Sequence, residues 1–222
     1  MSKLAFIFPG QGAQKAGMGK DFYENSEAAR SFFDQAQKIL DFDLKEMCFG
    51  EHEELNLTEY TQPCMVSVCL AIVQELKKRG INPDITAGLS LGEYAAVAAA
   101  DGMNELDAIK LVRRRGILMQ STVPAGEGAM AAVLGLDAKK IEEILESFEN
   151  VWIANYNCPG QIVITGLTNE VQQASLALKE AGAKRVVELK VSGPFHSLLL
   201  KPAGEALLKE MESMSFSTLQ VP

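Results

Sequence analysis

Histidine is scarce in this chain, and the residues that build metal sites or disulfide scaffolds form no cluster. The 222 residues include two histidines, His52 and His196, and four cysteines with no CxxC spacing. A structural zinc site needs clustered cysteine and histidine ligands, and a disulfide scaffold needs a dense cysteine framework. The sequence therefore predicts no metal site, reduced thiols and a cytoplasmic location.

Long apolar runs are also missing. The run at residues 4–8 is too short for a signal-peptide core, and no stretch of 18 apolar residues occurs. The net charge of −8 argues against nucleic acid, because phosphate binding needs a surplus of lysine and arginine. We expect a globular chain whose partners are neither nucleic acid nor membrane, with enough hydrophobic residues (47%) for a core.

Short apolar runs alternate with helical periodicity over the first 126 residues. The run at residues 4–8 predicts a buried strand, and residues 85–88 predict a second short strand. Helices are expected at about residues 22–39, 61–79, 91–100 and 104–121. Thr61 is the expected N-cap of the second of these helices, with Pro63 in its first turn. Such alternation favours an α/β domain with parallel strands.

The pattern changes near residue 127. We expect a β-α-β-β-α-β order, with strands at residues 129–134, 151–157, 161–165 and 185–191 and helices at 138–148 and 169–181. This order is typical of a ferredoxin-like module. The expected domains are therefore residues 1–126 with 193–222, and an inserted subdomain at 127–192. Because a parallel sheet would need more elements after residue 222, we also expect the sequence to be a C-terminally incomplete fragment.

A G-x-S-x-G motif lies between a predicted strand and a predicted helix, at residues 88–92 with Ser90 in its centre. The turn is so tight that side chains beside the serine would collide, so glycine is needed on both sides. The helix N-terminus that follows offers free N–H groups to a developing oxyanion. Ser90 is the predicted nucleophile, and a plain strand-turn-helix with small residues is the alternative.

A serine hydroxyl needs a base, and the two histidines are the candidates. His52 lies in a charged run, residues 51–54, which is typical of a solvated loop. His196 lies just past the last predicted strand, where catalytic side chains often sit. His196 is therefore the predicted base, and a packed or surface histidine is the alternative. No acidic residue stands out as a third member.

Arg115 falls within the apolar face of its predicted helix, whereas Arg114 points largely away. A buried cation requires a partner, because burying it alone is costly. Glu93 and a substrate carboxylate are equal alternatives for that partner. The glycine loop at residues 10–14 matches neither a dinucleotide fingerprint nor a P-loop, but its N–H groups can donate to an oxyanion.

These motifs together resemble those of the malonyl-CoA:acyl carrier protein transacylase family. The similar segments are collinear over essentially the whole chain, at residues 8–12, 88–95, 115–120, 128–132 and 157–163. The resemblance implies an α/β-hydrolase-like domain with a ferredoxin-like insert. It also implies ping-pong transfer of malonyl from coenzyme A to the phosphopantetheine thiol of acyl carrier protein in fatty acid biosynthesis, with no further cofactor.

The resemblance also assigns roles to six residues. They are the nucleophile Ser90, the base His196, the oxyanion-hole N–H groups of Gln11 and Leu91, Arg115 at the malonyl carboxylate, and Phe195, whose bulk excludes an extra methyl group. One position departs from the family, which commonly has histidine where Leu89 stands. A serine hydrolase or thioesterase on the same elbow, or an inactive fragment, remains the alternative.

Overall fold

The computed structural model describes residues 3–124, 126–189, 191 and 193–222. The chain divides into two compact units, Met1–Ile117 with Leu207–Pro222, and Leu118–Ala206. The expected domains divide at 126/127 and 192/193 instead, and residue 192 lies outside the described residues. Those domain limits remain a prediction.

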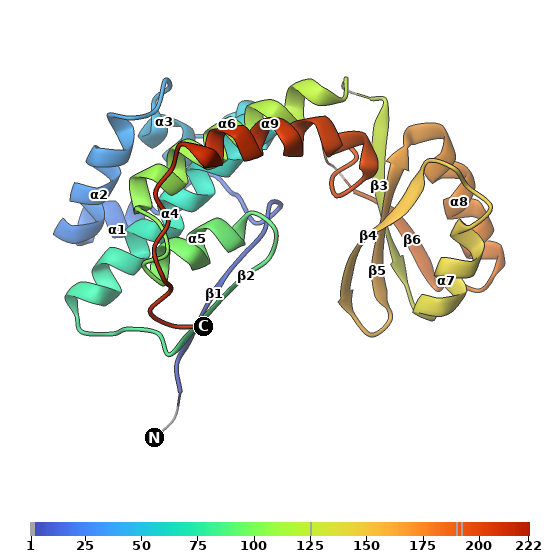
Figure 1. The fold of residues 1–222 in the computed structure, drawn as a ribbon, viewed down its shortest axis with the longest axis horizontal. Helices are drawn as coiled ribbons and strands as arrows, with labels where there is room; N and C mark the ends of the chain where they lie inside the picture. The colour runs from blue at the N-terminus through green and yellow to red at the C-terminus, as the bar shows by residue number, and fades with distance from the viewer. Residues whose placement is uncertain (1–2, 125, 190, 192) are drawn as a thin grey trace. The chain divides into compact units, whose positions relative to one another are not determined.

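The first unit contains a parallel pair of strands, β1 (Ala5–Phe8) and β2 (Ile85–Gly88), in which Ala5 pairs with Ile85 (Figure 1). The two runs predicted as parallel strands are therefore confirmed as strands. The burial predicted for residues 4–8 is wrong for Leu4 and Ile7, which are 42% and 78% exposed. The helices around them are α1 (Lys20–Asn25), α2 (Glu27–Gln37), α3 (Leu44–Phe49), the 3-10 turn η1 (Glu53–Asn56), α4 (Thr58–Lys78) and α5 (Gly92–Ala99). Helices α6 (Glu105–Thr122) and α9 (Lys201–Glu212) each belong partly to this unit.

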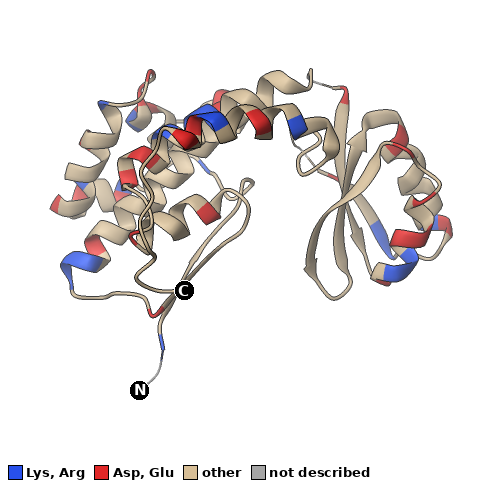
Figure 2. Ribbon diagram, in the orientation of Figure 1, with Lys and Arg blue, Asp and Glu red and all other residues tan. Residues whose placement is uncertain are grey.

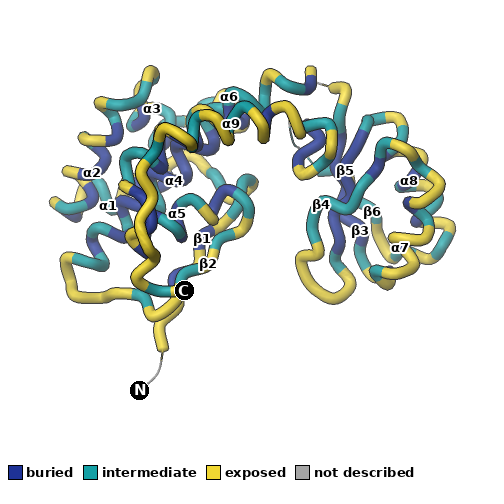
Figure 3. The backbone as a smooth tube through the Cα atoms, viewed as in Figure 1, coloured by how far each residue is buried: buried dark blue, intermediate teal, exposed yellow. Residues whose placement is uncertain are grey.

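Helix α4 lies in the core of the first unit and is buried on several sides (Figure 3). It begins at Thr58, so the predicted cap at Thr61 is wrong. The Thr61 hydroxyl donates instead to the carbonyls of Leu55 and Leu57, at 2.6 and 3.0 Å. Pro63 consequently lies inside the helix and lacks the N–H that would bond the Glu59 carbonyl.

One helix was predicted over residues 22–39, but two are present. The helix is interrupted at Ser26. The Ser26 side chain accepts a hydrogen bond from the Ala29 N–H at 3.0 Å and donates one to the Glu75 carboxylate. Hydrogen bonds to Ser26 and Arg79 lower the pKa of Glu75. The break therefore results from a cap whose second partner is 49 residues away.

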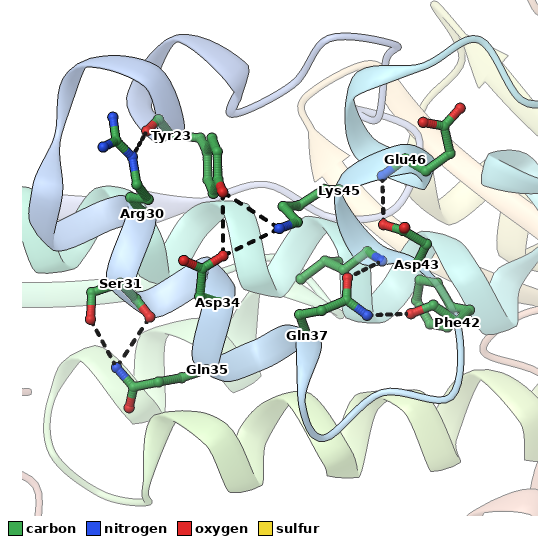
Figure 4. A network of polar contacts seen from close by, with 11 residues as sticks. Tyr23, Arg30, Ser31, Asp34, Gln35, Gln37, Phe42, Asp43, Lys45 and Glu46 are labelled. Atoms are coloured by element: carbon green, nitrogen blue, oxygen red, sulfur yellow. Dashed lines mark hydrogen bonds and ion pairs between the residues drawn. The ribbon is translucent and has the colours of Figure 1, made fainter.

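Polar contacts connect α1, α2 and α3 (Figure 4). The Tyr23 hydroxyl and the Lys45 ammonium both donate to Asp34 Oδ1, each at 3.3 Å. Asp43 caps α3 through the Glu46 N–H at 2.9 Å. These short-range bonds fix the three helices against one another at the surface of the first unit.

The C-terminal residues lie against β2 and the segment between α5 and α6. Pro222 accepts a hydrogen bond from the Thr86 N–H at 2.8 Å, and Phe216 forms an isolated antiparallel bridge with Met103. The Gln220 N–H donates to the Ala100 carbonyl at 2.9 Å. Backbone hydrogen bonds therefore hold this C-terminal segment in the first unit.

The second unit is an antiparallel sheet of order β4-β5-β3-β6. Its elements are β3 (Gly128–Leu134), α7 (Ala138–Leu145), β4 (Val151–Cys158), β5 (Gln161–Leu167), α8 (Thr168–Glu180) and β6 (Arg185–Glu188). The β-α-β-β-α-β order confirms the predicted ferredoxin-like pattern. The last strand is shorter than predicted, and within the expected range Lys190 lies outside the described residues.

Alternation along β3 gives the sheet two buried faces. Ala129, Ala131 and Val133 pack with residues of α7 and α8, whereas Met130 and Ala132 pack with Phe195. Both signs of charge are spread over the helices of each unit (Figure 2). Within the described ranges, no helix is long and apolar enough to cross a membrane.

Candidate active site

Ser90 lies at the tight turn between β2 and α5. Its φ is 51°, in the left-handed region that non-glycine residues rarely adopt. A Cβ added to Gly88 would lie 2.1 Å from the Gly92 carbonyl carbon, and one added to Gly92 would lie 2.3 Å from the Phe8 carbonyl oxygen. Both flanking glycines are therefore required by backbone contact, as a nucleophile elbow demands.

The loop after β1 lies against this turn. A Cβ on Gly10 would be 2.9 Å from the Leu89 carbonyl oxygen, and the Leu89 N–H donates to the Phe8 carbonyl at 3.2 Å. Over the described ranges, the N–H groups of Gln11 and Leu91 donate to no other residue. Two N–H groups of this kind can serve as an oxyanion hole, which is their predicted role.

Arg115 approaches the serine from α6. Its Nη2 donates to Ser90 Oγ at 3.3 Å, and its guanidinium carbon lies 5.5 Å from the centre of the Tyr94 ring. Burial lowers the pKa of Arg115 and raises that of Tyr94. In the part of the chain that the structure describes, no carboxylate forms an ion pair with Arg115, and Glu93 is no exception.

The two preceding arginines are engaged elsewhere. The Arg113 guanidinium binds both carboxylate oxygens of Asp41 at 3.0 Å, and it donates to the Glu59 carbonyl at 2.8 Å. Arg114 pairs with Glu210 at 2.9 Å. Arg115 is therefore the member of this run that lies beside the serine.

His196 and Phe195 belong to the second unit, whereas Ser90 belongs to the first, so their pairing remains a prediction. His196 is exposed and has a φ of 59°. Phe195 is buried against β3 and β5, and the Pro194 ring covers Gly128, where a Cβ would lie 2.2 Å from it. The histidine is thus presented on a tight turn whose base is packed in the core of its own unit.

Two contributions were missed from the sequence. Tyr94 lies in the first turn of α5, directly after the elbow, so its closeness to Ser90 in the sequence could have identified it as a neighbour of the site. The second is a buried polar contact of Gln11, whose Nε2 donates to Thr58 Oγ1 at 3.1 Å. No local pattern signals it, because the two residues are 47 positions apart.

Metal chemistry finds no support in the side chains. Among the residues placed by the structure, no group of three histidine, cysteine or carboxylate residues could hold a metal ion. The four cysteines are free thiols, and burial raises the pKa of Cys69 to about 11. Separately, Ser90 offers a hydroxyl for nucleophilic attack beside the Arg115 cation, which can bind an anion.

Comparison with known proteins gives a consistent result. The acyl transferase domain model matches residues 5–222. A malonyl CoA-acyl carrier protein transacylase of Bacillus subtilis (strain 168) is 48% identical over 227 residues, which cover 100% of this chain and 72% of that protein. One of Staphylococcus aureus (strain MSSA476) is 48% identical over 206 residues, and the chain spans 66% of its length.

A solved structure is similar over the whole chain. It is described as a type II PKS acyl-carrier protein in complex with its malonyl-transacylase. The match has a TM-score of 0.96 and 39% sequence identity, and it covers 100% of this chain and 73% of that one. The similarity therefore extends over the whole fold of this chain.

Proposed function

The chain belongs to the acyl transferase family, in the group of malonyl-CoA:acyl carrier protein transacylases, and from this membership we propose how it acts. It transfers a malonyl group from coenzyme A to the phosphopantetheine thiol of acyl carrier protein through an ester on Ser90. The coenzyme A thioester is the substrate, and the reaction uses no further cofactor.

The first half-reaction acylates Ser90. The Oγ attacks the thioester carbonyl while His196 accepts its proton, and the N–H groups of Gln11 and Leu91 stabilise the tetrahedral oxyanion. Coenzyme A leaves as the thiol, taking that proton from the imidazolium. In the second half-reaction the phosphopantetheine thiol gives its proton to His196 and attacks the ester, and Ser90 regains its hydrogen. One base and one oxyanion hole serve both steps, so the kinetics are ping-pong.

Selection of malonyl depends on Arg115, and the position of its guanidinium is the observation that carries the proposal. Nη2 lies 3.3 Å from Ser90 Oγ, and no ion pair with a described carboxylate occupies the cation. An acyl group esterified to Ser90 with a free carboxylate can supply that missing anion in bidentate geometry. An acetyl group would leave the desolvated guanidinium unpaired, which a polar site penalises strongly.

Two features refine the proposal. Phe195, packed in its own unit, limits the size of the acyl group, so an extra methyl is excluded. Leu89, which is exposed, replaces the family's usual histidine and changes the rate without removing the nucleophile or base. The pathway is fatty acid biosynthesis and the location is cytoplasmic.

The test is intact mass spectrometry after mixing with malonyl-CoA. A malonyl adduct that is absent from Ser90→Ala, and that acyl carrier protein discharges, is the expected result. The Arg115→Ala variant should lose the preference for malonyl-CoA over acetyl-CoA. The neighbouring variant Arg114→Ala is the matched control and should keep that preference, because its side chain is exposed and pairs with Glu210. Release of free malonate without an adduct would instead identify a hydrolase. The absence of both an adduct and turnover would identify an inactive fragment.

A further inference from the structure

The first turn of α4 contacts the loop that carries Gln11. Thr58 Oγ1 accepts a hydrogen bond from Gln11 Nε2 at 3.1 Å, and Gln62 Nε2 donates to Gln11 Oε1 at 3.4 Å. Thr58 and Gln62 are one helical turn apart and both are fully buried. The two ends of the Gln11 amide are therefore held by one face of α4.

This anchor adds to the other restraint on the loop, in which the Gly12 N–H donates to Gln14 Oε1 at 2.8 Å. Glycines flank Gln11 on both sides, and Gly12 has a φ of 109°. Glycine populates many backbone conformations, so these two glycines alone do not fix the direction of the Gln11 N–H. A side chain bonded to a buried helix restricts that direction.

The same turn of α4 also contacts the helix that carries Arg115. A Cβ on Gly116 would lie 2.7 Å from both the Thr58 carbonyl oxygen and the Glu59 Cα. These are backbone atoms of α4, so they cannot rotate away from an added methyl group. Gly116 therefore lets α6 approach α4 closely, and Arg115 is the adjacent residue.

We propose that Thr58 and Gly116 are positioning residues, through which the first turn of α4 sets the separation between the Gln11 N–H and the Arg115 guanidinium. This inference rests on the proposed function, in which the N–H binds the reacting carbonyl and the guanidinium binds the free carboxylate of the same acyl group. The two groups of malonate are a fixed distance apart. A shift of 1 Å in such a pair of contacts can reduce a rate by roughly a hundredfold.

The two positions have different consequences. Removing the Thr58 hydroxyl frees the Gln11 side chain and weakens oxyanion binding, which every thioester needs. Adding a methyl group at Gly116 moves Arg115, whose proposed ion pair forms only with a substrate that has a free carboxylate. A purely structural role at either position would lower the active fraction equally for all substrates.

The experiment measures single-turnover acylation of Ser90 by malonyl-CoA and by acetyl-CoA, with intact protein and quenched-flow mass detection. Thr58→Val should lower the maximal rate about tenfold for both donors, the loss expected for one hydrogen bond of about 1.4 kcal/mol, and Thr58→Ser should restore it. Gly116→Ala should lower the malonyl-to-acetyl ratio at least tenfold while the acetyl rate stays within about twofold of the original.

Circular dichroism and active-site titration confirm that each variant is folded. The proposal is overturned if folded Thr58→Val keeps the original rate, if Thr58→Ser is as slow as Thr58→Val, or if Gly116→Ala lowers both donors equally. Failure of the proposed function has a different signature, because then the unmodified protein itself forms no malonyl ester.

Discussion

Arg113 is a largely buried arginine of the first unit, and its replacement by methionine tests how much its contacts contribute to stability. The side chain is 11% exposed, and its guanidinium lies over the rings of Phe42 and Tyr60 at 5.3 and 4.9 Å from their centres. It also binds Asp41 and both a carboxylate oxygen and the carbonyl of Glu59. Because Pro63 has no N–H, this arginine is the donor that the Glu59 carbonyl would otherwise lack.

The magnitude follows from these contacts. Leaving the Glu59 carbonyl without its donor costs about 1–3 kcal/mol. The two ring contacts contribute about 0.5–1 kcal/mol each, and the ion pair with the exposed Asp41 adds at most about 1 kcal/mol. Methionine keeps most of the apolar stem, so we expect Arg113→Met to lower the free energy of unfolding by about 3 kcal/mol.

Arg114→Met is the matched control. Arg114 is the next residue of the same helix and forms, among the described residues, a single ion pair, in which its side chain is 49% exposed and its partner Glu210 is 41% exposed. Such exposed pairs are worth about 0–1 kcal/mol. Urea unfolding followed by circular dichroism gives both values, and fluorescence of Trp152 reports separately on the second unit. A difference between the two variants below about 1 kcal/mol would refute the reasoning.

The pH dependence of the free energy of unfolding gives a second test of the contact between Arg113 and Asp41. The hydrogen bond from Arg113 lowers the pKa of Asp41. A carboxyl group with a depressed folded-state pKa contributes stability above its unfolded-state pKa, and this contribution is lost as the pH falls through the folded-state value. The stability gap between the original chain and Arg113→Met should therefore narrow as the pH falls below about 4.

Three further predictions concern the elbow, a helix cap and the thiols. Gly88→Ala should abolish ester formation and lower the thermal midpoint, because its Cβ would overlap the Gly92 backbone; a folded, active variant would contradict the elbow geometry. Ser26→Ala should lower the free energy of unfolding by about 1 kcal/mol, measured in urea, and an unchanged midpoint would argue against the cap. At pH 8 a disulfide reagent should modify exposed Cys158 quickly and Cys69 slowly, since burial raises the Cys69 pKa to about 11; equal rates would be inconsistent with that burial.

Local patterns predicted most of the elements and the turn that presents the serine. The β-α-β-β-α-β order was readable because apolar alternation and helical periodicity change clearly along residues 128–188. The glycines of the elbow were readable because the strand and the helix leave no room for side chains between them. In both cases the determining contacts are close in sequence.

Three errors of the sequence analysis have a common physical cause. In each case the structure depends on a hydrogen bond to a residue that is distant in sequence. The start of α4 was misplaced because Pro63 lies inside the helix, where Arg113, 50 positions later, donates to the Glu59 carbonyl in place of the N–H that proline lacks. The break at Ser26 was missed because its hydroxyl also bonds Glu75. The anchor of Gln11 on Thr58 was missed for the same reason. Local rules cannot supply any of these partners.

The three consecutive arginines show how a helix distributes charge by rotation alone. Successive residues are turned by about 100°, so each guanidinium meets a different environment. Two of them meet carboxylates of the chain, Asp41 with Glu59 for Arg113 and Glu210 for Arg114. Arg115 meets a tyrosine ring and the serine hydroxyl, and its desolvation makes an anion there more valuable than at either neighbour. Under the proposed function, the malonyl carboxylate supplies the negative charge that the described carboxylates of the first unit do not pair with Arg115, and this would place substrate selection within one hydrogen bond of the nucleophile.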